Sequence, residues 1–290
     1  MNVTHDPAEL SPGERAVALG SFDGVHRGHR RVLETAIGAG LPATAVTFWP
    51  HPRLVLGNRV ELLSTLRRRL ELFEAAGIPE TLVLEFTAEL AQLEAREFAE
   101  SILRRIGARV IVVGEDFRFG HAASGNAELL ADLGFDVRPV PILEGVSSTR
   151  IRRLVAAGDV EGAAELLGRP PELEGVVVLG DERGGTLGFP TANLDVPREL
   201  LVPAYGIYAG ATLGHRAAIS IGVNPHYGGA EQRVESYLLD FQGDLYGQRL
   251  VLELWRRLRE EQAFASEEEL VRQIAADVEQ ARLASAPPVS

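Results

Sequence analysis

The chain of 290 residues changes its rhythm of apolar segments at about residue 168. Before that point, short apolar runs alternate with longer stretches in which apolar residues recur with the period of a helix. Strands that alternate with helices form parallel sheets with right-handed crossovers, so we predict an N-terminal doubly wound, Rossmann-like α/β domain over residues 1–168. The expected strands are residues 16–19, 43–48, 81–84, 110–113 and 137–141.

The helices expected between these strands have recognisable faces and ends. One places Leu66, Leu70 and Phe73 on a single face. Ser64 is its candidate N-cap and Gly77 its stop signal. A longer helical pattern follows, with apolar residues at Leu90, Leu93, Phe98 and Ile102.

From Pro170 onward, Gly- and Pro-rich turns separate short β-like runs. Helix is scarce until Ser266, which forms a capping-box pattern with Glu269. We therefore predict an antiparallel β-barrel with a terminal helix over residues 169–290. The expected strands are residues 175–179, 207–212, 217–222, 234–241 and 250–255, and the apolar face of the helix is Leu270, Ile274 and Val278.

The composition excludes several kinds of chemistry. All 29 residues counted as Lys or Arg are arginine, and cysteine is absent. A Schiff-base lysine, a thiolate nucleophile, a disulfide, a Cys-ligated metal and a Walker-A loop are therefore excluded. The net charge of −12 argues against a nucleic-acid binder. The polar start and the lack of a long apolar run predict no export signal and no membrane span, so we expect a cytoplasmic protein.

The first motif with chemical meaning, residues 20–29, follows the first expected strand and opens a helix. Helix starts of this kind favour anions, because free backbone N–H groups and the helix dipole meet there. His26 and His29 lie near that start, and Gly28 lets a phosphate approach the backbone. Their imidazoles can donate hydrogen bonds to phosphate oxygens. The alternatives are a pair of surface histidines or a chance metal pair.

Three more segments lie where strands of the same sheet should end, namely residues 48–52, 114–120 and 147–152. Together they surround one crevice with hydroxyl, guanidinium and imidazole donors, a plausible triphosphate environment. Arg152 is the best candidate for a phosphate contact, because a guanidinium matches phosphate geometry bidentately. Each segment also has a purely structural explanation: a turn at His51, a loop cap at Asp116, and helix caps at Ser148 and Thr149.

The second motif, residues 187–194, places Thr191 and Asn193 two positions apart. In an extended segment both side chains point to one face, where a hydroxyl and an amide oxygen can hold Mg²⁺ together with phosphate oxygens. Nearby glycines permit close approach of a nucleotide. Glu235, in an otherwise apolar strand, can take a proton from a hydroxyl nucleophile or can be an ordinary exposed strand residue.

The residues 20–29 resemble the HxGH nucleotidyltransferase superfamily. The whole set of motifs, over roughly residues 15–283, resembles the prokaryotic bifunctional riboflavin kinase/FAD synthetase family. The resemblance implies that riboflavin is phosphorylated by ATP to FMN, and that FMN is then adenylylated by ATP to FAD and pyrophosphate. Phosphoryl transfer needs mainly positioning and charge neutralisation. The FMN phosphate is already ionised, so the second reaction needs no general base.

The resemblance also implies roles for individual residues. The implied catalytic residues are Glu235, His26, His29 and Arg152. The implied nucleotide-binding residues are Gly20, Phe22, Asp23, Gly28, Asp116, Ser148, Thr149, Gly180, Gly188, Pro190, Thr191 and Asn193, with Thr191 and Asn193 holding Mg²⁺. The implied flavin-binding residues are Phe48, Pro50, His51, Phe117, Tyr208, Arg259 and Phe264.

The chain departs from the family pattern at a few positions, which puts local substrate contacts in question rather than the reaction class. These positions are His121, Ala123, Gly185, His226 and Ala263. Two other functions stay open at this point. One is a monofunctional nucleotidyltransferase with a regulatory β domain, and the other is a flavin-sensing binding protein. The intact set of Thr191, Asn193 and Glu235 argues against the first. The retention of His26, His29 and Glu235 argues against the second.

Overall fold

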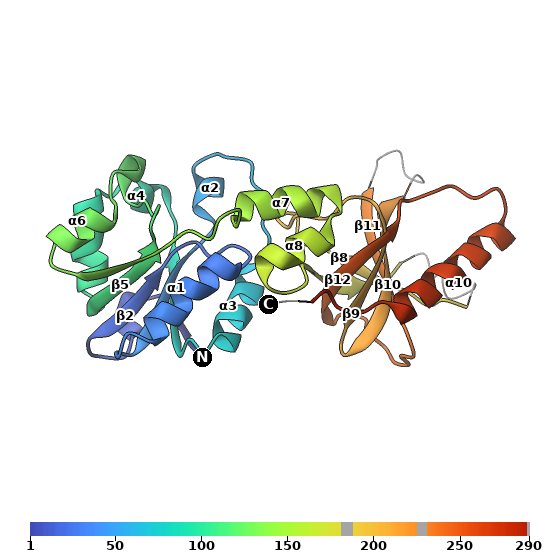
Figure 1. The fold of residues 1–290 in the computed structure, drawn as a ribbon, viewed down its shortest axis with the longest axis horizontal. Helices are drawn as coiled ribbons and strands as arrows, with labels where there is room; N and C mark the ends of the chain where they lie inside the picture. Colours follow the sequence, from blue (N-terminus) through green and yellow to red (C-terminus); the bar gives the residue numbers. More distant parts are fainter. Residues whose placement is uncertain (181–187, 225–230, 289–290) are drawn as a thin grey trace. The chain divides into compact units, whose positions relative to one another are not determined.

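The computed structural model describes residues 1–180, 188–224 and 231–288. The chain divides into two compact units (Figure 1). The first unit consists of Met1–Val60 and Ser64–Ser148, and the second of Glu61–Leu63 and Thr149–Ser290. Gly185 and His226, two of the departures noted above, lie outside the described residues.

The first unit is built on a parallel sheet of six strands in the order β1-β4-β3-β2-β5-β6. Five strands confirm the predicted apolar runs: β2 (Arg15–Leu19), β3 (Ala43–Trp49), β4 (Glu80–Glu85), β5 (Ala108–Gly114) and β6 (Asp136–Val140). The sixth, β1 (Asn2–Thr4), was not predicted. It has three residues in a polar segment and pairs only with β4, so it carries no apolar run of its own.

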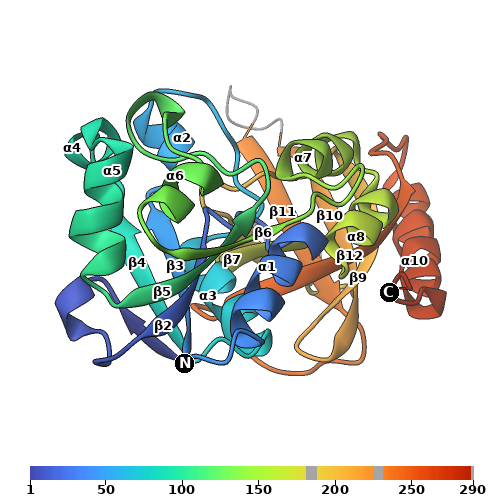
Figure 2. The ribbon, with the colours of Figure 1, turned by 60° about the vertical axis from the view of Figure 1, so that its left-hand side comes forward.

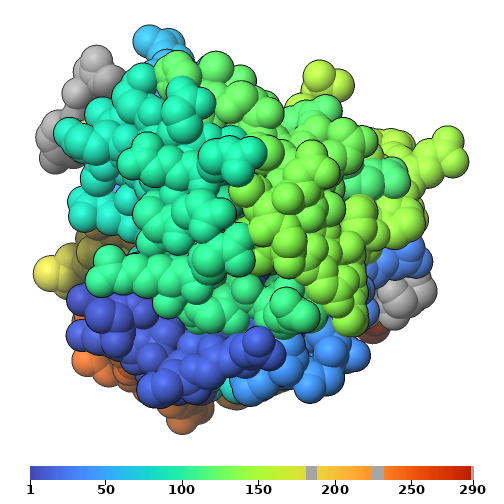
Figure 3. Space-filling model, turned by 90° about the vertical axis from the view of Figure 1, so that its left-hand side faces the viewer, coloured from blue at the N-terminus to red at the C-terminus, as the bar shows by residue number. Residues whose placement is uncertain are grey.

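Helices cover both faces of this sheet, as the doubly wound prediction requires (Figure 2). On one face, α1 (Arg27–Ile37) and α3 (Leu66–Ala75) bury Leu33 and Phe73. On the other, Phe98 and Leu130 belong to the second apolar layer. The elements of that face are α4 (Ala88–Gln92), α5 (Ala95–Phe98), the π-helical segment η2 (Ala99–Arg104) and α6 (Ala127–Asp132). Figure 3 looks onto the first unit, with its N-terminal residues in dark blue along one edge.

Two helix predictions for this unit were wrong in detail. The pattern from Leu90 to Ile102 is not one helix, because Leu93 and Glu94 are extended and separate α4 from α5. The carbonyl of Leu93 accepts a hydrogen bond from the His121 N–H instead (2.8 Å). The N-cap of α3 is Thr65 rather than Ser64, and its hydroxyl accepts from the Arg68 N–H.

The second unit is a closed antiparallel barrel of six strands in the order β10-β11-β8-β7-β12-β9. This confirms the predicted barrel. The strands are β7 (Glu172–Val178), β8 (Ala192–Asp195), β9 (Gly206–Thr212), β10 (His215–Asn224), β11 (Glu231–Leu238) and β12 (Arg249–Arg259). Of these strands only β8 was not predicted, although its first three residues lie within the second motif. Its four residues alternate between core and surface.

Three helices complete the described part of the second unit. The short helices α7 (Ser148–Ala157) and α8 (Val160–Leu167) pack through Ile151, Val155 and Leu167 against Leu63 and Leu201. Residues 61–63 join this unit because Leu62 exchanges backbone hydrogen bonds with Glu199 and Leu201. By packing, α7 and α8 thus belong with the barrel, while the boundary at residues 168/169 stays a prediction about function.

The terminal helix α10 (Glu267–Leu283) contacts β9 and β10. As predicted, Ser266 caps it, accepting from the Glu269 N–H (3.3 Å). In turn, the N–H of Ala265, one residue before the cap, donates to the Glu269 carboxylate (3.1 Å). Among the described helices, none has the length and apolar character needed to cross a membrane.

Candidate active sites

The histidine loop, residues 20–29, joins the end of β2 to the start of α1 and brings the two histidines together as predicted. His26 is the N-cap of α1, and its Nδ1 accepts a hydrogen bond from the His29 N–H (3.2 Å). The two imidazole rings stack, with centroids 3.6 Å apart. A side chain at Gly28 would lie 3.2 Å from the His26 ring, so glycine gives this ring its room.

The histidine loop has an unusual backbone that neighbouring residues hold in place. Phe22 and Val25 are buried with φ values of 51° and 39°. Such values are uncommon outside glycine and costly for a β-branched residue, so the surrounding structure must enforce them. The ring of Phe22 packs edge-on against His29 and Phe73. It also lies so near Gly20 that a Cβ there would be 3.1 Å from it.

Asp23 anchors the loop from within the protein. Its carboxylate accepts hydrogen bonds from the backbone N–H and the hydroxyl of Ser64 (3.2 and 3.4 Å). The Gly24 N–H in turn donates to Ser64 Oγ (3.1 Å), and Ser148 Oγ donates to the Asp23 carbonyl (3.1 Å). Ser64 is therefore a site residue that sequence analysis assigned to the wrong role. A direct contact between Asp23 and a nucleotide stays a prediction.

The strand-end residues expected to bind flavin are partly used by the fold itself. Phe48 is buried and packs edge-on against Phe86. His51 is buried at the N-cap of the short helix α2 (Pro52–Val55), where its Nδ1 accepts from the Arg53 N–H (3.2 Å). Phe117 stacks on Phe119 with centroids 5.6 Å apart. His51 thus has a structural role as a helix cap rather than in the turn considered above, and flavin binding by this group stays a prediction.

Asp116 and Pro50 also lie at strand ends of the first unit, whereas Thr149 and Arg152 belong to the second unit. Asp116 is exposed, and the Trp49–Pro50 peptide bond is cis. The Arg152 Nε donates to the carbonyl of Glu61 (2.7 Å), which is also in the second unit. The predicted contacts of Thr149 and Arg152 with ATP therefore stay predictions.

In the barrel, a cavity of about 320 Å³ lies between α10 and the outer face of β9, β10 and β11; we call it the helix cavity. Thr191 and Glu235 line it from the barrel, and the predicted apolar face of α10 lines it from the helix. Along β11, residues with buried side chains alternate with Glu235 and Tyr237, which line the helix cavity. This alternation explains how an apolar strand can place a carboxylate in the cavity.

Two of the predicted flavin-binding residues, Arg259 and Phe264, also line the helix cavity. The Arg259 guanidinium donates charge-assisted hydrogen bonds to Asp277, from Nε to Oδ1 and Oδ2 (3.0 and 3.1 Å) and from Nη2 to Oδ2 (2.7 Å). It also lies over the Phe264 ring, 5.8 Å from its centroid. Asp277, a buried carboxylate on α10, fixes this arrangement and was missed by sequence analysis.

Tyr208 was expected with this group, but it does not line the helix cavity. Its side chain is completely buried in the barrel core, and its hydroxyl donates to the carbonyl of Ala204. Burial raises the pKa of this phenol. The residue thus packs the barrel core, and a contact between Tyr208 and a flavin stays a prediction.

A second cavity of about 360 Å³, the strand cavity, is lined by residues of β7, β8, β11 and the segment 241–246. Pro190 and Thr191 line it, so Thr191 borders both cavities. The Thr191 hydroxyl lies 3.5 Å from Glu235 Oε2. Ser236, which no motif singled out, is completely buried and lines the strand cavity.

Asn193 lies beside these residues with an unsatisfied oxygen. Its Oδ1 is buried and has no hydrogen-bond partner among the residues that the structure describes. A Cβ at Gly180 would lie 2.1 Å from the Asn193 amide nitrogen, so only glycine fits there. Gly188 has a φ of +86°, which also favours glycine. Within the described ranges, no group of three or more His, Cys, Asp or Glu side chains could hold a metal ion.

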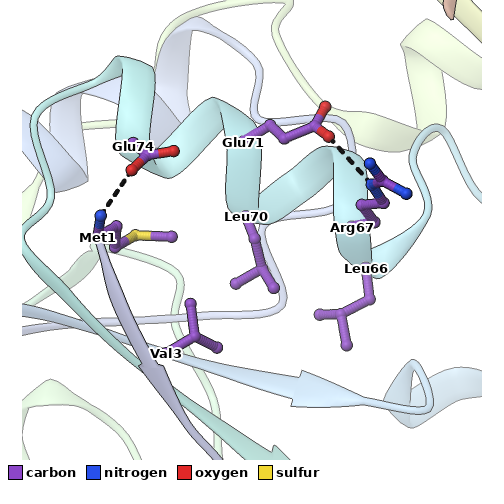
Figure 4. A pocket seen from close by; sticks show the side chains of 7 residues that line it. All are labelled: Met1, Val3, Leu66, Arg67, Leu70, Glu71 and Glu74. Atoms are coloured by element: carbon purple, nitrogen blue, oxygen red, sulfur yellow. Dashed lines mark hydrogen bonds and ion pairs between the residues drawn. The ribbon is translucent and has the colours of Figure 1, made fainter.

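A third hollow, of about 360 Å³, lies between β1 and α3 and contains none of the predicted site residues (Figure 4). Val3, Leu66 and Leu70 line it, flanked by an ion pair between Arg67 and Glu71. Its lining is mainly apolar, and the cationic groups of Arg67 and Met1 are paired with Glu71 and Glu74.

Comparison with known proteins gives two family matches that follow the two halves of the chain. The model described as FAD synthetase matches residues 9–151, and the model described as riboflavin kinase matches residues 167–284. Two relatives are named bifunctional riboflavin kinase/FMN adenylyltransferase. The one from Escherichia coli K12 is 36% identical to this chain (92% of each chain covered), and the one from Listeria monocytogenes is 34% identical (92% of this chain, 91% of the relative). A solved structure named a macrolide-efflux protein from Streptococcus pneumoniae is 33% identical, with a TM-score of 0.87 over 98% of this chain and 99% of that one.

Proposed function

The chain belongs to the bifunctional riboflavin kinase/FMN adenylyltransferase family, which makes FMN and FAD, and we propose that its two units divide these reactions between them. The first unit adenylylates FMN at the histidine loop, and the second unit phosphorylates riboflavin at the barrel. The positions of the two family matches support this division. We also propose the boundary between the functions at residues 168/169, and the cytoplasm as the compartment.

One observation carries the assignment of the kinase site: Thr191 borders both barrel cavities and lies beside Glu235. Riboflavin occupies the helix cavity, where Phe264 and the apolar face of α10 offer surfaces for a flat ring. ATP occupies the strand cavity. The phosphoryl group then passes between the two cavities next to Thr191.

Glu235 is the proposed general base of the kinase reaction. Its carboxylate lines the helix cavity, within reach of a substrate hydroxyl bound there. It takes the proton of the riboflavin 5′-hydroxyl as that oxygen attacks the γ-phosphorus of ATP, and ADP leaves. Positioned bases of this kind contribute roughly 10²–10⁴-fold to a rate.

The donor set around Asn193 fits Mg²⁺. A buried amide oxygen without a partner and the Thr191 hydroxyl are hard oxygen ligands, which Mg²⁺ prefers, and this ion usually completes its shell with water and phosphate oxygens. Bound Mg²⁺ supplies neutralisation of phosphate charge. The role of the chain is to hold the two oxygens in place, with Gly180 leaving the space that the Asn193 amide fills.

In the adenylyltransferase reaction, an oxygen of the FMN phosphate attacks the α-phosphorus of ATP, and pyrophosphate leaves. His26 and His29 are the proposed donors to the phosphate oxygens, together with backbone N–H groups at the start of α1. Donors that are already in position stabilise the charge that develops on those oxygens.

The experiment is to incubate the pure protein with riboflavin, ATP and Mg²⁺ and to separate the flavins by chromatography. FMN should appear first and FAD after it. Omitting Mg²⁺ and adding EDTA should stop FMN formation. If FMN accumulates without FAD, the role of the first unit is contradicted. If FAD forms only when FMN is supplied, the role of the second unit is contradicted.

A further inference from the structure

Arg69, on α3, is among the largest completely buried side chains that the structure describes, and the reactions described above do not use it. Its Nη1 donates to Thr47 Oγ1 (3.3 Å) and to the Phe48 carbonyl (3.2 Å). Its Nε and Nη2 are buried and have no hydrogen-bond partner within the described part of the chain. The guanidinium also lies 5.7 Å from the centroid of the Trp49 ring.

A buried guanidinium with unsatisfied N–H groups is costly to the fold. Burial lowers the pKa of Arg69 to about 10, against the opposing effect of the nearby Asp23 carboxylate. Arg69 therefore still carries its charge at neutral pH. Since an apolar residue would avoid the cost, the presence of arginine at this position calls for an explanation.

Arg69 is connected to the histidine loop through its neighbours. Thr47, which accepts from Arg69, donates its own hydroxyl proton to the carbonyl of Ser21 (3.2 Å). Phe73, one turn further along α3, packs edge-on against Phe22. Ser64, just before α3, binds the Asp23 carboxylate. Three consecutive residues of the loop, 21–23, are thus held by α3, by Ser64 just before it, or through Thr47.

We propose that Arg69 is a positioning residue for adenylyl transfer. Its buried charge, balanced by Asp23, holds the loop in the left-handed backbone conformation seen at Phe22 and Val25, and this conformation orients His26 and His29. The inference rests on the proposed assignment of the histidine loop as the nucleotide site. Arg69 itself touches no reacting atom; it acts through Thr47 and Asp23.

The test uses Arg69→Met, which removes the charge at similar length, and Arg69→Lys, which keeps it. The control is Arg68→Met on the same helix, because Arg68 is partly exposed and pairs with Glu71. We expect Arg69→Met to lower kcat for FAD formation from supplied FMN by about 100-fold, the effect typical of a displaced catalytic group. Arg69→Lys should recover most of it, and Arg68→Met should change it less than twofold.

FMN formation by the same polypeptide serves as the internal control, since the kinase site lies in the other unit. It should stay within twofold in all three variants. The NMR signals of the His26 and His29 rings should shift in Arg69→Met and stay in place in Arg69→Lys. Equal loss of both reactions, or unchanged FAD formation in Arg69→Met, would overturn the proposal.

Two further variants keep the outcome decisive. If Arg69→Met does not fold, Thr47→Val removes the link to Ser21 at similar side-chain volume and should still lower kcat for FAD formation about tenfold; no loss would overturn the proposal. His26→Asn is measured in parallel. If His26→Asn leaves FAD formation intact, the assignment of the nucleotide site itself fails. If only His26→Asn is impaired, the role of Arg69 alone fails.

Discussion

Asn193 and Glu235 lie directly opposite each other on the antiparallel strands β8 and β11. Residues paired in this way project to the same face of a sheet. Their neighbours Leu194 and Val234, also paired, point into the apolar core. Leu194 and Val234 thus serve packing on the inner face, while Asn193 and Glu235 serve the proposed kinase chemistry from the outer face.

Glu235→Gln keeps the size of the side chain but removes its basicity. We expect FMN formation to fall by roughly 10²–10⁴-fold, because the riboflavin hydroxyl loses its proton acceptor. FAD formation from supplied FMN should be unchanged. Initial rates of both reactions, measured by chromatography of the flavins, check this. A wild-type rate of FMN formation would remove Glu235 from the mechanism.

His26→Asn tests the imidazole separately from its structural role. His26 also caps α1, and asparagine is among the best N-cap residues, so the helix should keep its start. We expect FAD formation to fall by about 10²–10³-fold, the usual loss when one donor to a developing charge is removed. FMN formation should persist. His26→Ala, which lacks the cap, should in addition lower the unfolding temperature of the first unit.

Gly180→Ala should impair only the kinase. The added Cβ would lie 2.1 Å from the Asn193 amide nitrogen, so Asn193 must move. Because a small displacement of a positioned group can cost about 100-fold in rate, we expect a loss of this order in FMN formation and none in FAD formation from FMN. Gly38→Ala is the control, since its Cβ would make an ordinary contact of 3.5 Å with the Glu34 carbonyl. Equal kinase rates in the two variants would contradict the role of Asn193.

Glu80 should make the stability of the first unit depend on pH in the acidic range. Burial raises the pKa of this carboxyl group, but hydrogen bonds from Ser11 and the charge of Arg15 outweigh burial, so the pKa lies below its ordinary value. The folded pKa is thus lower than the unfolded one. The stabilisation is therefore present above pH ~4.3, the ordinary pKa of Glu, and is lost as the pH falls through the folded pKa.

Glu80→Gln should therefore cost about 3 kcal/mol of unfolding free energy at pH 7, as expected when a buried ion pair loses one partner. This difference from the wild type should shrink below pH ~4.3. Urea unfolding followed by Trp49 fluorescence in a Trp255→Phe background reports on the first unit. Glu71→Gln, which breaks a more exposed pair with Arg67, should cost less than about 1 kcal/mol. A difference that does not change with pH would contradict the linkage.

The parts of the fold that the sequence predicted are those whose signal is local. Apolar runs marked five strands of the sheet and five of the barrel, and the Ser266 cap marked the start of α10. The short strands β1 and β8 were missed because three or four residues in polar surroundings carry no period. Their pairing with β4, β7 and β11 depends on segments far away in the chain.

The same distinction applies to the sites. His26 and His29 could be placed because they flank a strand-to-helix junction, and Thr191 and Asn193 because they are two residues apart. Ser64 and Arg69 could not. Ser64 forms its hydrogen bond with Asp23, a residue 41 positions away in the sequence. Arg69 ends a run of three arginines that has the pattern of a solvated helix face, yet it alone is completely buried.

The central claim is that each unit carries one complete reaction, and mixing two variants tests it most directly. With riboflavin, ATP and Mg²⁺, His26→Asn alone should stop at FMN, and Glu235→Gln alone should make almost no product. Together they should make FAD, because the FMN released by one is adenylylated by the other. If His26→Asn alone makes no FMN, or if the mixture makes no FAD, the claim is contradicted.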